Sequence, residues 1–140
     1  MVIDTSALIA ILRGEPEEAA FLRAILAAPR RMISAMTKLE ASMVAIGTGD
    51  PGGADDLDEL LAELQVTVVA FDDRQADVAR AAFVRFGRGR HPAALNFGDC
   101  AAYALAVCEA EPLLFKGTDF AATDVAVVVP GGGSFQENIP

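Results

Sequence analysis

Short apolar runs that resemble strands alternate with helix-like stretches along this 140-residue chain. The strand-like runs fall at 2–3, 31–34, 66–71, 113–115 and 125–129, and helical patterns occupy 7–12, 15–29, 37–46, 54–64, 72–86 and 99–110. Strands that alternate with helices form parallel sheets covered by helices on both faces. The chain is therefore predicted to be an α/β protein, a three-layer α/β/α sandwich around a parallel sheet of about five strands.

The length and composition suit one domain with a buried core, because 53% of the residues are hydrophobic and Trp is absent. We expect this domain to span 1–130 and a flexible tail to span 131–140. Asp4 interrupts the first apolar run before a signal peptide could form, and no apolar stretch could cross a bilayer. Cys100 and Cys108 lie roughly 12 Å apart along one predicted helix, beyond disulfide reach. A cytoplasmic location is expected, with no membrane partner.

The charge of the chain is unevenly distributed. A net charge of −9 argues against a general nucleic-acid-binding surface, which is usually basic. Residues 85–91 nevertheless read R-F-G-R-G-R-H and contain Arg85, Arg88, Arg90 and the single histidine, His91. This loop could contact nucleic-acid phosphates, or it could simply be a solvated surface loop.

Four acidic residues are expected at one edge of the sheet. In a parallel α/β fold, the carboxyl ends of the strands and the amino ends of the following helices share an edge, where ligands bind. Asp4 ends the first strand, Glu40 lies early in the helix after the second, Asp99 opens a helix, and Asp119 follows the fourth strand. The topology therefore brings four carboxylates together.

Each of these acids also has a structural interpretation. Thr37 and Glu40 match a helix capping box, and Asn96 and Asp99 form a near relative of one. Asp4 could cap the first helix, and Asp119 could be a turn residue. Asp72 follows a strand and opens a helix in the same way, and we assign it a structural role only, so position alone overpredicts sites.

Converging carboxylates repel one another unless a cation lies between them. Mg²⁺ or Mn²⁺ suits oxygen ligands, and the sequence contains no Cys/His spacing typical of zinc. A site of this kind binds Mg²⁺ through one or two carboxylates, water and substrate phosphate oxygens. It therefore indicates hydrolysis of phosphodiester bonds.

Four motifs together resemble the PIN-domain ribonucleases, and more narrowly the VapC-type toxins of bacterial type II toxin–antitoxin pairs. They are V-I-D-T-S-A at 2–7, Thr37-x-x-Glu40, N-F-G-D at 96–99 and L-L-F-K-G-T-D-F at 113–120. The resemblance covers essentially the whole chain. It implies a PIN-like fold and a Mg²⁺-dependent endoribonuclease, with Mn²⁺ as a possible substitute, that cleaves structured RNA such as transfer or ribosomal RNA. It also implies a small antitoxin partner and a homodimer.

The resemblance assigns roles to particular residues. Asp4 and Asp99 would bind the metal directly, and Asp119 would support the metal or the water. Glu40 would orient or deprotonate the attacking water. The same resemblance implies that Ser6 and Asn96 hold the carboxylates in place, and Lys116 is the preferred phosphate contact. Many relatives have two adjacent acids where this chain has Thr118 and Asp119, so the role of Asp119 is the least defined.

Three alternatives follow from the same residues. The chain could be a PIN nuclease of RNA processing that has no antitoxin. It could be a receiver-like signalling domain, although that function expects paired acids where Thr5 and Ser6 stand. It could also be a degenerate PIN domain that only binds, which the presence of all four acids argues against.

Overall fold

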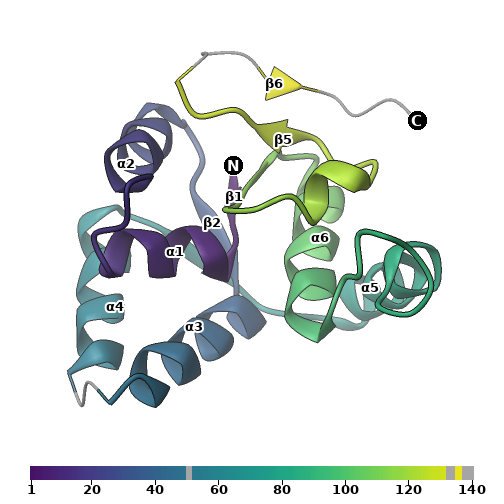
Figure 1. Cartoon of the computed structure of the whole chain (residues 1–140), viewed down its shortest axis with the longest axis horizontal. Helices are drawn as coiled ribbons and strands as arrows, with labels where there is room; N and C mark the ends of the chain where they lie inside the picture. The colour runs from purple at the N-terminus through teal and green to yellow at the C-terminus, as the bar shows by residue number, and fades with distance from the viewer. Residues whose placement is uncertain (50–51, 132–134, 137–140) are drawn as a thin grey trace.

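A twisted sheet forms the centre of the computed structural model, which describes residues 1–49, 52–131 and 135–136 (Figure 1). Within those residues the strands lie in the order β3-β2-β1-β4-β5-β6. The neighbouring pairs from β3 to β5 are parallel, and β6 pairs antiparallel with β5. The strands are β1 (Val2–Ile3), β2 (Met32–Ser34), β3 (Thr67–Val69), β4 (Leu113–Leu114), β5 (Val127–Val128) and β6 (Phe135–Gln136).

Helices cover both faces of this sheet. They are α1 (Thr5–Leu12), α2 (Glu18–Ala27), α3 (Ala35–Gly47), α4 (Gly53–Glu63), α5 (Asp73–Phe86), α6 (Phe97–Glu109) and the 3-10 turn η1 (Phe120–Ala122). Figure 1 shows α1 to α4 on one side of the sheet and α5 and α6 on the other. The predicted three-layer sandwich with a central parallel sheet is confirmed.

Adjacent residues of β1, β2, β4 and β5 supply two separate hydrophobic cores, because side chains alternate across a strand. Ile3 packs with Ile33 and Leu114 against α1 to α4. Val2 packs with residues of α5 and α6 in the second core. The two-residue strands β1 and β4 thus join both layers, and burial on both faces explains their continuous apolar sequence.

Some element boundaries differ from the prediction. Helix α3 begins at Ala35 because Ser34 is its cap and accepts a hydrogen bond from the Met36 backbone N–H at 3.1 Å. The capping box expected from Thr37 and Glu40 is therefore wrong. Thr37 is instead buried in the first turns of the helix.

The end of the chain contains one further strand. The tail expected from residue 131 includes β6, while 132–134 and 137–140 of that prediction lie outside the described residues. Among the residues that are described, no helix is both long and apolar enough to cross a membrane.

Candidate active site

Asp4 lies where β1 turns into α1. Its backbone N–H donates to the Leu114 carbonyl oxygen at 2.9 Å, which continues the β1–β4 pairing to the end of both strands. The Asp4 carboxylate caps α1, since its Oδ2 accepts from the Ser6 N–H at 3.1 Å and the Ser6 hydroxyl at 2.7 Å. The Ser6 oxygen in turn accepts from the Lys116 N–H at 2.9 Å. Ser6 therefore links the Asp4 carboxylate to the loop after β4.

The other oxygen of Asp4 is in an unusual situation. Asp4 is 4% exposed, and within the described residues its Oδ1 is buried without a hydrogen-bond partner. A buried carboxylate oxygen without a partner is energetically costly, so it needs a ligand such as a proton or a cation. The structural role of capping and a role in binding a ligand are therefore compatible in one side chain.

Asp99 opens α6 in a true capping box. The Asp99 N–H donates to Asn96 Oδ1 at 2.9 Å, and the Asn96 N–H donates to Asp99 Oδ2 at 3.0 Å. The reciprocal pair fixes the Asp99 carboxylate at the amino end of the helix. Asn96 thus holds this carboxylate, as the resemblance implied.

Glu40 reaches the same edge from α3. Its Oε1 accepts a hydrogen bond from the Thr5 hydroxyl at 2.5 Å, although the two residues are 35 positions apart. Its Oε2 lies against Gly98, since a Cβ atom built on that glycine would stand 1.9 Å away. The carboxylate is therefore placed between the amino ends of α1 and α6, beside Asp4 and Asp99.

Asp119 is exposed and precedes η1. Its charge acts on Asp99, because it contributes to the raised pKa of that carboxyl. The four predicted acids thus form one electrostatic group: Asp4 is influenced by Asp99 and Glu40, and Asp99 by Asp119 and Glu40.

Two carboxyls of this group, those of Asp4 and Asp99, have raised pKa values. The pKa of Asp4 is raised from 3.8 to about 6, mainly by burial and also by the charges of Asp99 and Glu40, while the hydrogen bonds from Ser6 oppose the change. Burial also raises the pKa of Asp99, together with the charges of Asp119 and Glu40, while the Asn96 hydrogen bond and Arg88 lower it. A cation would favour the ionised form of these carboxyls.

The donor set fits a hard cation that retains water. No three His, Cys, Asp or Glu side chains converge as a ready-made metal cluster within the described residues. Mg²⁺ is commonly bound by only one or two carboxylates, with water and substrate phosphates as its other ligands. Asp4, whose Oδ1 has no hydrogen-bond partner in the described part of the chain, and Asp99 are the residues that suit this role.

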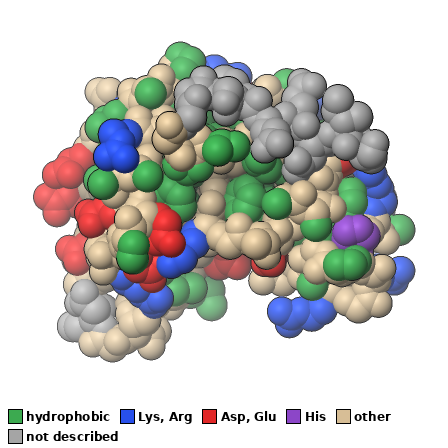
Figure 2. All heavy atoms as spheres, turned by 45° about the horizontal axis from the view of Figure 1, so that its top comes forward, with side chains coloured by type: hydrophobic (Ala, Val, Ile, Leu, Met, Phe, Trp, Pro, Cys, Tyr) green, Lys and Arg blue, Asp and Glu red, His purple; other side chains and the backbone are tan. Residues whose placement is uncertain are grey.

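The expected RNA contacts differ in their surroundings. Arg85 pairs with Asp124 at 2.9 Å and lies over the Phe86 ring, and Arg90 lies over the Phe83 ring. Arg88 is exposed and close enough to lower the pKa of Asp99. Figure 2 shows the single histidine with basic side chains at the right of the visible face, and at the left most of the visible acidic side chains together with further basic ones.

Lys116 lies in the loop after β4 and is also paired. Its Nζ contacts Glu15 at 2.6 Å and Glu17 at 3.3 Å. A phosphate would have to compete with both acids for this ammonium group. The contribution of Lys116 that the structure shows directly is its backbone N–H, which holds Ser6.

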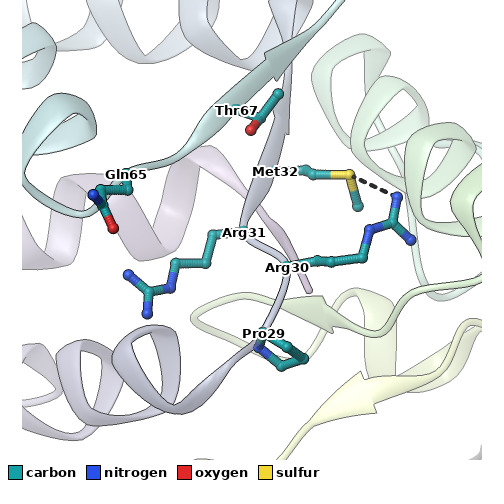
Figure 3. Close-up of a pocket in the computed structure, with 6 residues that line it drawn as sticks. All are labelled: Pro29, Arg30, Arg31, Met32, Gln65 and Thr67. Atoms are coloured by element: carbon teal, nitrogen blue, oxygen red, sulfur yellow. Dashed lines mark hydrogen bonds between the residues drawn. The ribbon is translucent and has the colours of Figure 1, made fainter.

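A hollow of about 350 Å³ lies away from the acids, at the amino ends of β2 and β3 (Figure 3). Its two arginines are already occupied. Arg31 donates to the carbonyl oxygens of Ala28, Leu64 and Leu26, and Arg30 pairs with Glu109 and Glu111. These contacts tie helix ends to the sheet, so this hollow has a structural explanation and the candidate site remains at the carboxyl edge.

Two residues of the site were not predicted from the sequence. Thr5 and Gly98 both contact Glu40, but each lies next to a predicted acid and was read as part of its motif. A glycine in the first turn of a helix, where alanine is normally better, was the available signal for Gly98.

Comparison with known proteins agrees with this geometry. The family model of the PIN domain matches residues 1–126. Ribonuclease VapC28 of Mycobacterium tuberculosis is 50% identical over 126 residues, which cover 89% of this chain and 95% of that protein. The chain therefore belongs to the PIN-domain family. Within it, the chain is a member of the VapC ribonucleases, as the four motifs predicted.

Solved structures share the fold at lower identity. Mycobacterium tuberculosis VapC20, described as a Sarcin-Ricin loop cleaving toxin, has a TM-score of 0.74 and 18% identity, with 92% of this chain and 98% of that one covered. The toxin–antitoxin complex from Klebsiella pneumoniae has a TM-score of 0.69 and 21% identity, with coverage of 92% and 96%. The solved structures show the fold, and the 50% identity to ribonuclease VapC28 favours a ribonuclease over a receiver-like signalling domain.

Proposed function

We propose that this chain is the toxic ribonuclease of a toxin–antitoxin pair and that it hydrolyses phosphodiester bonds of structured RNA with Mg²⁺, or with Mn²⁺ as a substitute. The observation that carries the proposal is the buried Asp4 carboxylate, whose Oδ1 faces no described hydrogen-bond donor and lies among Asp99 and Glu40. Such a carboxylate is well suited to bind a divalent cation.

The residues of the site divide the work between binding and proton transfer. Asp4 and Asp99 would hold the metal, and their orientation is set by Ser6 and Asn96. When bound, Mg²⁺ would polarise the phosphodiester and lower the pKa of a water molecule. Glu40 would orient the attacking water and accept its proton, while Asp119 adds negative charge near Asp99.

The RNA must approach an edge that is itself acidic. Arg88 is the best placed of the predicted phosphate contacts, because it is close enough for its charge to lower the pKa of Asp99. Arg85, Arg90 and Lys116 would assist after exchanging their present partners for phosphate. Binding through few phosphate contacts should favour a folded RNA, such as transfer or ribosomal RNA, over arbitrary sequences.

The partner proposed is a small antitoxin with basic side chains that covers the acidic edge. The net charge of −9 makes such a partner electrostatically complementary, and the solved relative from Klebsiella pneumoniae is described as a toxin–antitoxin complex. We also propose a homodimer. A PIN nuclease of RNA processing would share the site but need no antitoxin. Growth arrest on expression that a neighbouring small gene product relieves separates the two functions.

The catalytic test compares Asp4→Asn and Asp99→Asn with Asp72→Asn, because Asp72 also caps a helix after a strand and accepts from the Gln75 N–H at 2.9 Å. The first two variants should lose cleavage of purified transfer and ribosomal RNA, as should the unsubstituted protein with a chelator, whereas Asp72→Asn should cleave normally. Undiminished cleavage by Asp4→Asn would refute the mechanism. Sequencing the RNA ends after brief expression, with Asp4→Asn as control, identifies the target.

A further inference from the structure

The Glu40 carboxylate is held from two sides by residues that have no assigned role. The Thr5 hydroxyl of α1 donates to one carboxylate oxygen, Oε1, at 2.5 Å. The other oxygen, Oε2, lies so close to Gly98 of α6 that a Cβ on this glycine would stand 1.9 Å from it and 2.4 Å from the carboxyl carbon. Three separate helices therefore meet at this one carboxylate.

The contact from Thr5 is strong and specific. A hydroxyl that donates to a carboxylate at this length forms a charge-assisted hydrogen bond, about twice as strong as a neutral one. Thr5 is buried, and its neighbour in sequence is Asp4, so the first turn of α1 fixes two of the four acids. The spacing between Asp4 and Glu40 is thereby set by one rigid turn.

The contact at Gly98 explains why a glycine occupies this helix. Its φ lies outside the left-handed region, so an L-residue could adopt the backbone conformation. Alanine would ordinarily favour a helix there. What a Cβ would meet is the far end of the Glu40 side chain. At Gly53 and Gly87, in contrast, a Cβ would meet residues that pack the fold, Ala45 and Phe83.

We propose that Thr5 and Gly98 are positioning residues for Glu40: the hydroxyl holds one oxygen, and the missing side chain leaves room for the other. The inference rests on the proposed function in one respect, namely that Glu40 acts on the attacking water. A side chain at position 98 would push the carboxylate away from Asp99 and break its bond to Thr5. The fold would tolerate this, because only the end of a flexible side chain must move.

The first test uses RNA cleavage. Thr5→Val keeps the shape of the side chain without the hydroxyl, and Thr5→Ser keeps the hydroxyl. On an oligonucleotide spanning the site that the unsubstituted protein cuts, Thr5→Val and Gly98→Ala should each lower kcat roughly 10- to 100-fold with KM unchanged, since misplacement by about 1 Å has effects of this size. Thr5→Ser should recover most of the rate.

Gly47→Ala is the matched control, because it lies in the same helix as Glu40 and a Cβ there would meet nothing within 4 Å. It should cleave at the unsubstituted rate. Wild-type kcat in both Thr5→Val and Gly98→Ala would overturn the proposal, as would failure of Thr5→Ser to recover more activity than Thr5→Val.

The second test needs neither RNA nor metal. Thermal midpoints in chelator are measured for Gly98→Ala in the natural background and in the Glu40→Ala background. In the Glu40→Ala background, a Cβ at position 98 no longer meets a carboxylate. Gly98→Ala should then raise Tm by roughly 1–3 °C, as an ordinary Gly-to-Ala change in a helix does. With Glu40 present, the lost bond to Thr5 should cancel or reverse this gain. Equal shifts in both backgrounds would overturn the proposal.

The two tests also separate this inference from the proposed function. If the unsubstituted protein cleaves neither transfer nor ribosomal RNA, the proposed substrate fails, and the thermal comparison still decides whether Gly98 and Glu40 interact. If cleavage occurs and the thermal shifts are equal, the proposed function stands and the positioning role is refuted.

Discussion

Replacing Asp4 with asparagine should stabilise the metal-free protein at neutral pH while it removes activity. Burial raises the pKa of Asp4 from 3.8 to about 6, so the folded protein disfavours its ionised form. A displacement of about two pKa units corresponds to about 3 kcal/mol above pH 6. Asparagine carries no charge, and its Oδ1 can accept the two hydrogen bonds that Ser6 now donates to the carboxylate.

The asparagine NH₂ group would take the position of the buried oxygen that has no described donor, and it would need an acceptor there. This cost reduces the expected gain in stability to about 1–3 kcal/mol. With an unfolding entropy of about 0.3 kcal/mol/K for a chain of this length, Tm should rise by roughly 3–10 °C in chelator at pH 7.5. Mg²⁺ should stabilise only the unsubstituted protein, and so reduce the difference.

The pH dependence supplies the sharper control. The folded pKa of Asp4 is raised, so the native state binds more protons than the unfolded chain between about pH 4 and pH 6. The contribution of Asp4 to stability is therefore greatest below that window and falls as pH rises through it. The advantage of Asp4→Asn should grow across the same window. A variant that is less stable than the unsubstituted protein at pH 7.5, or an advantage that is independent of pH, would refute the reasoning.

Three further predictions follow from contacts of the structure. Asn96→Ala should lower stability by about 1 kcal/mol in chemical denaturation through loss of the α6 cap, and it should slow RNA cleavage because Asp99 loses its fixed orientation. Arg31→Met should lower stability by about 1–3 kcal/mol, since three carbonyl oxygens lose their donor, and leave kcat unchanged in the cleavage assay. Arg88→Ala should weaken RNA binding and reduce the slope of log affinity against log salt by about 1 in filter-binding measurements; an unchanged slope would exclude a phosphate contact.

The layers and the sheet of this protein could be predicted from the sequence because strands buried on both faces are apolar throughout. Residues such as Val2 and Ile3 serve different cores, so neither can be polar. Helix starts were predicted less well. Ser34 is both the last residue of β2 and the cap of α3. Ser34 and Thr37 both have a hydroxyl suited to capping, so the sequence does not show which of them begins the helix.

The meeting of the four acids at one edge of the sheet could also be predicted, since the alternation of strands and helices determines which residues share an edge. A role at a helix start does not exclude a role in catalysis for Asp4 and Asp99. Asp4 caps α1 through Oδ2, and Asp99 accepts from the Asn96 N–H through Oδ2 in the capping box of α6, so each has a second oxygen. The contacts of Glu40 could not be predicted. They join α1, α3 and α6, and only the packed structure brings Thr5 and Gly98 to the same carboxylate.

The Ser6 hydroxyl makes the site sensitive to the length of the loop after β4, although surface loops usually tolerate insertions. The hydroxyl donates a hydrogen bond to Asp4 and accepts one from the Lys116 N–H. Its orientation therefore depends on the number of residues between β4 and Lys116. Phe115 packs against one of the cores, so a residue added between Phe115 and Lys116 would leave both cores in place and move the Lys116 N–H away from this hydroxyl. Insertions that a surface connection ordinarily accepts should therefore yield folded but inactive protein.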